Sequence, residues 1–162
     1  MNRKARLLAH GALIGAMYVA LCHLQNLIFP ESATFAIQFR AAEALCVLAF
    51  FTPAAVSGLT VGCFLFNLTF AGALPTDIVI GPLASFLAAV SMRRLRKWPW
   101  LGLLMPALWN AVLVGWELMV YVGGGFWLNA LCVAIGEVAV LLTLGAALYG
   151  LLKRHLGSRL FA

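Results

Sequence analysis

Long apolar stretches, separated only by short breaks, make up nearly the whole of this 162-residue chain. A helix needs about 20 predominantly apolar residues to cross the hydrocarbon of a bilayer. Only helices and closed barrels satisfy every backbone polar group there. The residues are 64% apolar and only 10% charged, whereas a soluble domain carries about 25% charged residues. The sequence therefore predicts an all-α integral membrane protein, a compact bundle of six transmembrane helices.

The breaks between the stretches mark the expected helix ends. Prolines, a basic segment and a run of three glycines interrupt the apolar sequence. The second and fourth spans are short, so we expect them to be tilted, shielded by neighbouring helices or broken near one face. No repeat or second domain is visible, which predicts a single membrane domain over residues 1–162. The expected spans are residues 7–29, 36–51, 54–72, 76–92, 100–122 and 126–152.

Basic residues gather on one side of these spans. Three precede the first span, four follow the fourth and three follow the sixth, so ten of the 11 Lys and Arg residues share a side. Arg40 is the exception. By the positive-inside rule that side is the cytoplasm, and both termini are expected there. The net charge of +6 is then a topology signal with some contact to lipid headgroups, not a nucleic-acid-binding surface.

Polar side chains inside the spans gather toward the opposite, outer half. A charged side chain at the bilayer centre costs about 2.5–3.5 kcal/mol even on lenient scales, so these groups should face the bundle interior or a wet cavity. Asn110 and Glu117 share one face of the fifth span, and Phe126 and Glu137 share one face of the sixth. We expect an outward-opening substrate pocket. Its predicted lining is Glu137, Glu117, Asn110, Asn67, Asp77, Arg40, Glu43, Trp116, Phe126 and Trp127.

These residues also have interpretations without a ligand. Arg40 and Glu43, three residues apart, can pair with each other, and Asn110 can bond a neighbouring helix. The tryptophans can form an interfacial belt. Glu117 and Glu137 are the strongest pocket candidates, because the spans offer no spare basic residue to neutralise them.

Small residues form a stripe on the first span. Ala12, Ala16 and Ala20 recur every fourth residue, beside Gly11 and Gly15. Such a stripe lets another helix approach closely in lipid, where packing drives association. The partner is either a helix of this bundle or a different subunit.

The sequence gives no sign of a cofactor, a metal site or a catalytic nucleophile. The four cysteines lie apart, the three histidines are scattered, and HExxH, GxSxG and Walker lysine motifs are missing. We therefore expect no cofactor and no ATPase activity of its own. A small membrane enzyme that uses Glu117 or Glu137 as acid or base is the alternative from another class, and no nucleophile or metal set accompanies it.

Five segments carry a likeness to a known family. They are Gln38–Leu45, Gly62–Asn67, Asp77–Ala84, Trp109–Glu117 and Gly136–Glu137. In this order and spacing, with six spans and the alanine stripe, they resemble the QueT family, the queuosine-precursor substrate-binding (S) components of energy-coupling factor (ECF) transporters. The likeness runs over most of the chain, although Pro82 and the extra tryptophans depart from it.

The resemblance implies that the chain captures a 7-deazaguanine, such as queuine or a prequeuosine base, outside a bacterial plasma membrane. A separate transmembrane coupling subunit and two cytoplasmic ATPases would power its release inward. The alanine stripe would contact the coupling subunit, and the loop from Pro30 to Phe39 would serve as a lid. An S component for another small nutrient, such as a vitamin or nucleobase, is the alternative.

The roles inside the pocket stay open at this point. A guanine-like edge presents two adjacent donors, which one carboxylate accepts in parallel, and one acceptor oxygen. The candidates are Glu137 or Glu117 for the donors, Asn110, Asn67 or Arg40 for the oxygen, Phe126 or a tryptophan for stacking, and Asp77 for a cationic aminomethyl group.

Overall fold

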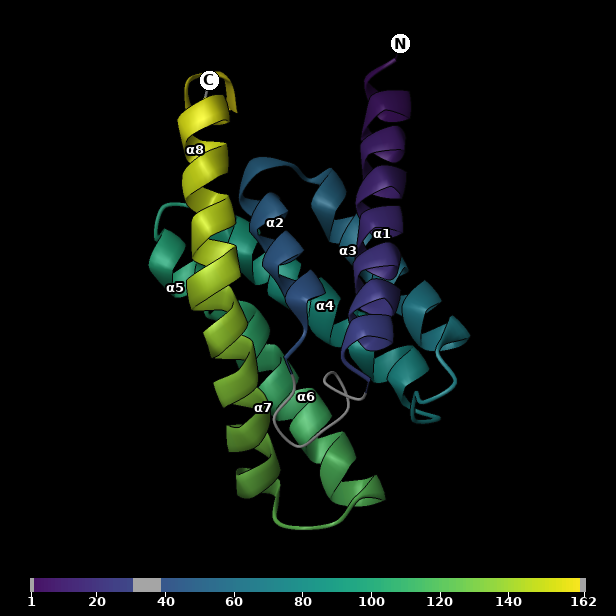
Figure 1. Cartoon of the computed structure of the whole chain (residues 1–162). Coiled ribbons are helices and arrows are strands. Elements are labelled where there is room, and N and C mark those ends of the chain that lie inside the picture. Colours follow the sequence, from purple (N-terminus) through teal and green to yellow (C-terminus); the bar gives the residue numbers. More distant parts are fainter. Residues whose placement is uncertain (1, 31–38, 161–162) are drawn as a thin grey trace.

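The computed structural model describes residues 2–30 and 39–160, and this part of the chain is helical with no strands (Figure 1). Six helical segments result, because η1 continues into α2, α5 leads into α6, and α7 runs through η2 into α8. The all-α prediction is confirmed. The elements are α1 (Arg3–Ile28), the 3-10 helix η1 (Ala41–Val47), α2 (Leu48–Phe51), α3 (Ala54–Thr69), α4 (Asp77–Arg94), α5 (Pro99–Leu103), α6 (Met105–Tyr121), α7 (Phe126–Val140), the π-helical turn η2 (Leu141–Gly145) and α8 (Ala146–Leu160).

Three of the segments are long and apolar enough to cross a membrane. They are Arg3–Ile28, Pro99–Tyr121 and Phe126–His155. The apolar helices Ala41–Phe51 and Ala54–Thr69 are shorter. The helices therefore give three clear span candidates, and six membrane crossings stay a prediction.

The chain reverses direction between α6 and α7 at the run of glycines. Gly123 and Gly124 have φ angles of 89° and 80°, a conformation that glycine adopts without the steric cost a Cβ would bring. This turn lies at the end of the molecule opposite to the two chain termini (Figure 1). Both termini therefore share one end of the bundle.

Helices α1 and α3 cross closely through glycines. A Cβ on Gly58 would lie 2.6 Å from the carbonyl oxygen of Gly11, and one on Gly62 would lie 2.9 Å from that of Gly15. Side chains cannot occupy such positions without moving a backbone. The glycines therefore let the two helices approach in a way that larger residues would prevent.

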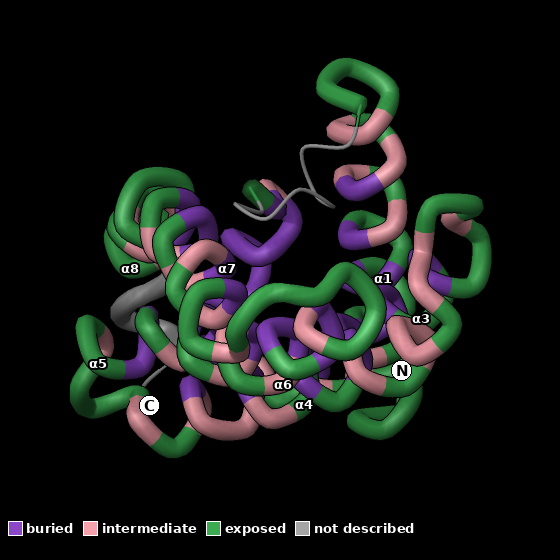
Figure 2. The backbone as a smooth tube through the Cα atoms, turned by 90° about the horizontal axis from the view of Figure 1, so that it is seen from below, coloured by how far each residue is buried: buried purple, intermediate pink, exposed green. Residues whose placement is uncertain are grey.

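The buried residues lie between the helices, whereas the outward faces are exposed (Figure 2). The largest apolar cluster joins α1, η1, α2, α3 and α4 with residues of α5, α6 and η2, among them Tyr18, Leu59, Met92, Leu103 and Leu141. A smaller cluster holds Val114, Leu118 and Val133 of α6 and α7. Exposed apolar side chains on the outside of the bundle match a protein whose surroundings are lipid.

The second helical segment is the most enclosed element. Residues Ala42 to Val47 are all buried, which agrees with the expectation that neighbours shield a short span. Its first part is a 3-10 helix of 7 residues, longer than the three or four residues usual for this conformation. Because a 3-10 helix has three residues per turn, residues three apart lie in one row. Glu43 and Cys46 have that spacing, and Arg40 directly precedes the helix.

Candidate functional site

Glu137 of α7 is fully buried at the contact with α6. The Asn110 Nδ2 donates a hydrogen bond of 3.1 Å to its Oε1. The other carboxylate oxygen, Oε2, is buried with no hydrogen-bond partner in the described part of the chain. One buried acceptor of Glu137 therefore stays unsatisfied, which is unusual inside a protein.

Glu43 of η1 uses both of its oxygens. The hydroxyl of Tyr18, on α1, donates to Oε1 at 2.7 Å, and the Cys46 thiol donates to Oε2 at 3.2 Å. Glu43 therefore does not depend on Arg40 for a partner. Its predicted contact with a substrate stays a prediction, although its oxygens are already engaged.

Arg40 precedes η1 and is only 9% exposed. Its Nε is buried and has no hydrogen-bond partner among the residues that the structure describes. Arg40 is thus a buried cation with an unused donor.

A second polar group lies where α4 begins against α3 and α6. The Thr76 hydroxyl donates to Oε1 of Glu117, which is fully buried, and Oε2 of Glu117 has no partner. The Leu74 N–H donates to the Asp77 carboxylate at 2.7 Å. The Asn67 Nδ2 donates to the backbone oxygen of Asp77, also at 2.7 Å. Asn67 therefore fixes the start of α4, and Glu117 keeps one free acceptor.

The aromatic candidates lie differently from one another. Phe126 is half-buried and meets Trp127 edge-on, with ring centroids 5.1 Å apart. Trp127 is 82% exposed and Trp116 is 49% exposed. The indole N–H of Trp109 donates to the Ser91 hydroxyl at 3.1 Å. The exposure of Trp116 and Trp127 fits the interfacial-belt interpretation, and their place in a pocket lining stays a prediction.

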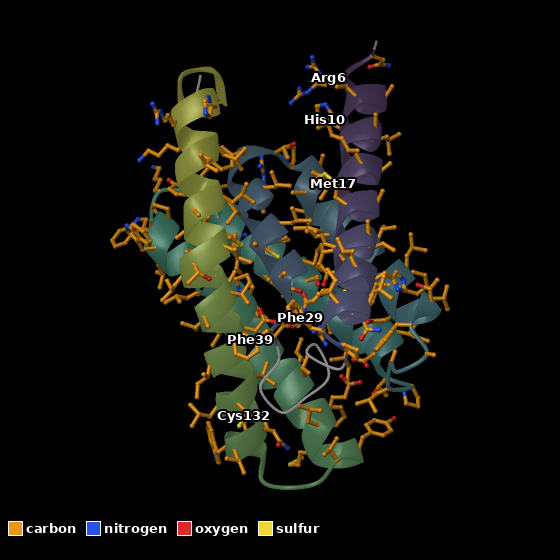
Figure 3. The ribbon with its side chains drawn as sticks, in the orientation of Figure 1. Arg6, His10, Met17, Phe29, Phe39 and Cys132 are labelled. Carbon is orange, nitrogen blue, oxygen red and sulfur yellow. The ribbon has the colours of Figure 1, made fainter. Side chains whose placement is uncertain are left out.

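An apolar cavity of about 520 Å³ adjoins Arg40. Phe29, at the end of α1, and Phe39 both line it, and both are exposed at its mouth, near each other in Figure 3. Its walls continue through Ala41, next to Arg40, and Val140, one turn after Glu137. The segment expected to form a lid lies outside the described residues, apart from Pro30 and Phe39.

The alanine stripe lies on the outside of the bundle. Ala12, Ala16 and Ala20 are exposed, whereas Gly11 and Gly15 are buried against α3. The stripe borders a groove of about 390 Å³ between α1 and α3. Within the described part of the chain, no helix covers these alanines.

Sequence reasoning missed four residues that hold the site together. They are Tyr18, Gln25, Cys46 and Thr76. A signal for two of them was present, because Tyr18 and Gln25 are seven residues apart and share one face of α1, opposite the alanines. Nothing in the spacing could have shown that Thr76 reaches Glu117, 41 residues away.

No group of three or more His, Cys, Asp or Glu residues suited to a metal ion occurs in the described ranges. The described side chains instead offer acceptor oxygens on Glu117 and Glu137 and the guanidinium of Arg40. This chemistry suits an uncharged or cationic molecule that donates hydrogen bonds to the two carboxylates.

The comparisons with known proteins agree with a transport role. The sequence model of the QueT transporter family matches residues 8–154. No curated protein and no solved structure matches the chain. Since the family match covers nearly the whole sequence and the helices are apolar, this membrane protein belongs to the QueT transporter family.

Proposed function

We propose that this chain is the substrate-binding subunit of an ECF-type importer and that it captures a 7-deazaguanine, such as queuine or a prequeuosine base. The observation that supports the proposal is a set of three buried polar atoms without partners among the described residues: Oε2 of Glu137, Oε2 of Glu117 and Nε of Arg40. Leaving such a group unpaired costs about 1–3 kcal/mol, and more when it is charged. A ligand that pairs all three would recover this free energy.

A guanine-like ring complements these atoms. Its N–H and exocyclic NH₂ are adjacent donors, and its oxo group is an acceptor. The Asn110 Nδ2 donates to Oε1 of Glu137 at 3.1 Å. The Oε2 of Glu137 is then the oxygen that would accept from the ligand. Arg40 supplies the donor for the oxo group. Charge-assisted hydrogen bonds of this kind are about twice as strong as neutral ones.

The acid excess supports a neutral or cationic substrate. Four of the chain's 5 acidic residues, Glu43, Asp77, Glu117 and Glu137, lie in η1, α4, α6 and α7, and Arg40 is the one buried cation among the described side chains. An anionic vitamin would meet repulsion from these carboxylates. We assign the group formed by Glu117, Thr76 and Asp77 to a cationic aminomethyl substituent, such as that of a prequeuosine base, and Phe126 to stacking on the ring.

The exposed alanine stripe supports a separate energising partner. Its three small side chains, with the groove beside them, give a smooth surface on which a helix of a coupling subunit can pack. Two cytoplasmic ATPases would drive that subunit, since this chain carries no Walker motif. The proposed location is a bacterial plasma membrane, with both termini in the cytoplasm.

Calorimetric titration of the purified protein tests the substrate. We expect 7-deazaguanine, its aminomethyl derivative and queuine to bind. The matched control is 7-deazaadenine, which lacks the oxo group and the paired donors and should bind at least about a hundredfold more weakly, a difference of about 2.7 kcal/mol. Binding of a vitamin in place of all three compounds would contradict the assignment and identify an S component for another nutrient.

A further inference from the structure

The side-chain amide of Gln25 forms hydrogen bonds to the backbone on both sides of Arg40. The Nε2 of Gln25 donates to the carbonyl oxygen of Phe39. The N–H of Ala41 donates to the Oε1 of Gln25 at 2.7 Å. One side chain of α1 thus satisfies the peptide groups before and after Arg40, as a neighbouring strand would.

These two hydrogen bonds flank a residue whose backbone is extended. Arg40 has φ −104° and ψ 93°, and its carbonyl accepts the first bond of η1, from the Glu43 N–H at 3.0 Å. An arginine side chain is long and can adopt many rotamers. Fixing the backbone from which it starts reduces the number of places that the guanidinium can reach.

A second bond between α1 and η1 reinforces the first. Tyr18 lies two turns before Gln25 on the same face of α1 and bonds Glu43 at 2.7 Å. Because the Glu43 N–H donates to the carbonyl oxygen of Arg40 at 3.0 Å, holding Glu43 also restrains the backbone of Arg40. Gln25 and Tyr18 therefore fix η1 against α1 at two points.

We propose that Gln25 is a positioning residue for substrate selectivity, which places the Arg40 guanidinium where it donates to the acceptor oxygen of the ligand. The inference rests on the proposed function, because it assumes a ligand with such an oxygen. Gln25 acts through the backbone of Arg40 in this proposal, since its amide is engaged with Phe39 and Ala41.

The test compares 7-deazaguanine with its 6-thio analogue, which keeps both N–H donors and replaces the oxygen by a weak acceptor. Wild-type protein should bind the oxo compound about tenfold more tightly than the thio compound, because the thio compound loses one charge-assisted hydrogen bond. Gln25→Leu should remove this preference by weakening oxo binding about tenfold while changing thio binding little. Arg40→Met should do the same, and the double variant should lose no more than either single variant, because both changes remove one interaction.

Two further variants keep the result interpretable. Gln25→Glu retains the acceptor for the Ala41 N–H but opposes the Phe39 carbonyl, so it should lose the preference even if Gln25→Leu fails to fold. Thr69→Val is the matched control, because it removes a bond between His23 on α1 and α3 of 3.0 Å without touching η1. It should keep the wild-type preference.

The outcomes separate the two proposals. Wild-type selectivity retained in both Gln25 variants, or equal weakening of both ligands, would overturn the positioning role alone. Wild-type protein that binds neither compound would overturn the proposed substrate and the positioning role with it.

Discussion

At the scale of single residues, this protein keeps polar atoms unsatisfied where most proteins pair them. Two carboxylate oxygens and one guanidinium nitrogen are buried without partners, although unpaired buried groups are rare in folded proteins. Their neighbours are satisfied: Asn110 bonds Glu137, and Thr76 bonds Glu117. Each glutamate thus has one oxygen that is hydrogen-bonded and one that could accept from a ligand, as the proposed binding site requires.

Glu137→Gln tests this pattern most directly. The amide oxygen can keep the bond from Asn110, so the NH₂ group takes the place of the free Oε2. A donor would then face the ligand's own N–H donors. Such a mismatch costs a few kcal/mol, and about 1.4 kcal/mol is tenfold in affinity, so 7-deazaguanine should bind about a hundredfold or more weakly in calorimetry.

Glu117→Gln is the companion variant, with monodispersity in size-exclusion chromatography as the folding control. If both variants bind queuine and prequeuosine bases like the wild type, the two glutamates serve helix packing. If only Glu117→Gln loses ligand binding, Glu117 of α6, not Glu137 of α7, accepts the hydrogen bonds of the ligand's donors.

At the scale of elements, α1 has two faces with separate tasks. One face packs Gly11 and Gly15 against α3 and holds η1 through Tyr18 and Gln25. The opposite face presents the exposed alanines. The helix that would contact a coupling subunit is therefore the helix that holds Arg40, so a shift of α1 would reach the site directly.

The glycine crossing of α1 and α3 should tolerate no added methyl group. In Gly58→Ala the new Cβ would lie 2.6 Å from the Gly11 carbonyl oxygen and 3.0 Å from the Ile14 Cβ. Overpacking of this kind costs about 1–3 kcal/mol, so the melting temperature in detergent should fall. Gly150→Ala is the matched control, because nothing lies within 4 Å of its Cβ position. There the change should stabilise α8 by about 0.5–1 kcal/mol.

The exposed stripe should be sensitive to bulk in a different assay. Ala16→Trp should abolish co-purification with a coupling subunit, and with it uptake, because the indole holds the two helices apart. Ligand binding to the isolated chain should be unchanged. Met17→Trp is the control on the same helix, since Met17 is exposed but points about 100° away from Ala16. Co-purification of Ala16→Trp at the wild-type level would contradict the interface assignment.

At the scale of the whole molecule, the helical fold was readable from the sequence because hydrocarbon leaves few alternatives to a helix. The apolar runs predicted the helices, and the energetic cost of charge predicted that Glu117 and Glu137 point inward, where both are fully buried. The 3-10 geometry of η1 was not predictable, and neither were its hydrogen bonds to Tyr18 and Gln25 of another helix. Helix periodicity gives the face of a residue, but not which neighbour meets that face.

The aromatic residues show the same limit. Trp116 lies on the helix that carries Asn110 and Glu117, yet it is 49% exposed while both of these are buried. Adjacent helix positions differ by about 100°, so Trp116 and Glu117 point to different sides of α6. Proximity along the sequence to Glu117 therefore does not decide whether Trp116 lines the pocket, and its place there stays a prediction.

The orientation of the whole bundle gives the last prediction. Ten of the 11 basic residues lie at the ends of the first, fourth and sixth segments, and moving them across the membrane would oppose the positive-inside preference. Both termini share one end of the molecule, and the glycine turn lies at the other (Figure 1).

We expect a membrane-impermeant maleimide to label Gly125→Cys in intact cells and Lys97→Cys only after permeabilisation. Both positions are exposed, and nothing lies within 4 Å of the Cβ position of Gly125, so neither substitution disturbs packing. The unsubstituted chain is the blank, since Cys22, Cys46 and Cys63 are buried and Cys132 is half-buried. The reverse labelling pattern would show that the site faces the cytoplasm, where it could not capture a substrate from outside.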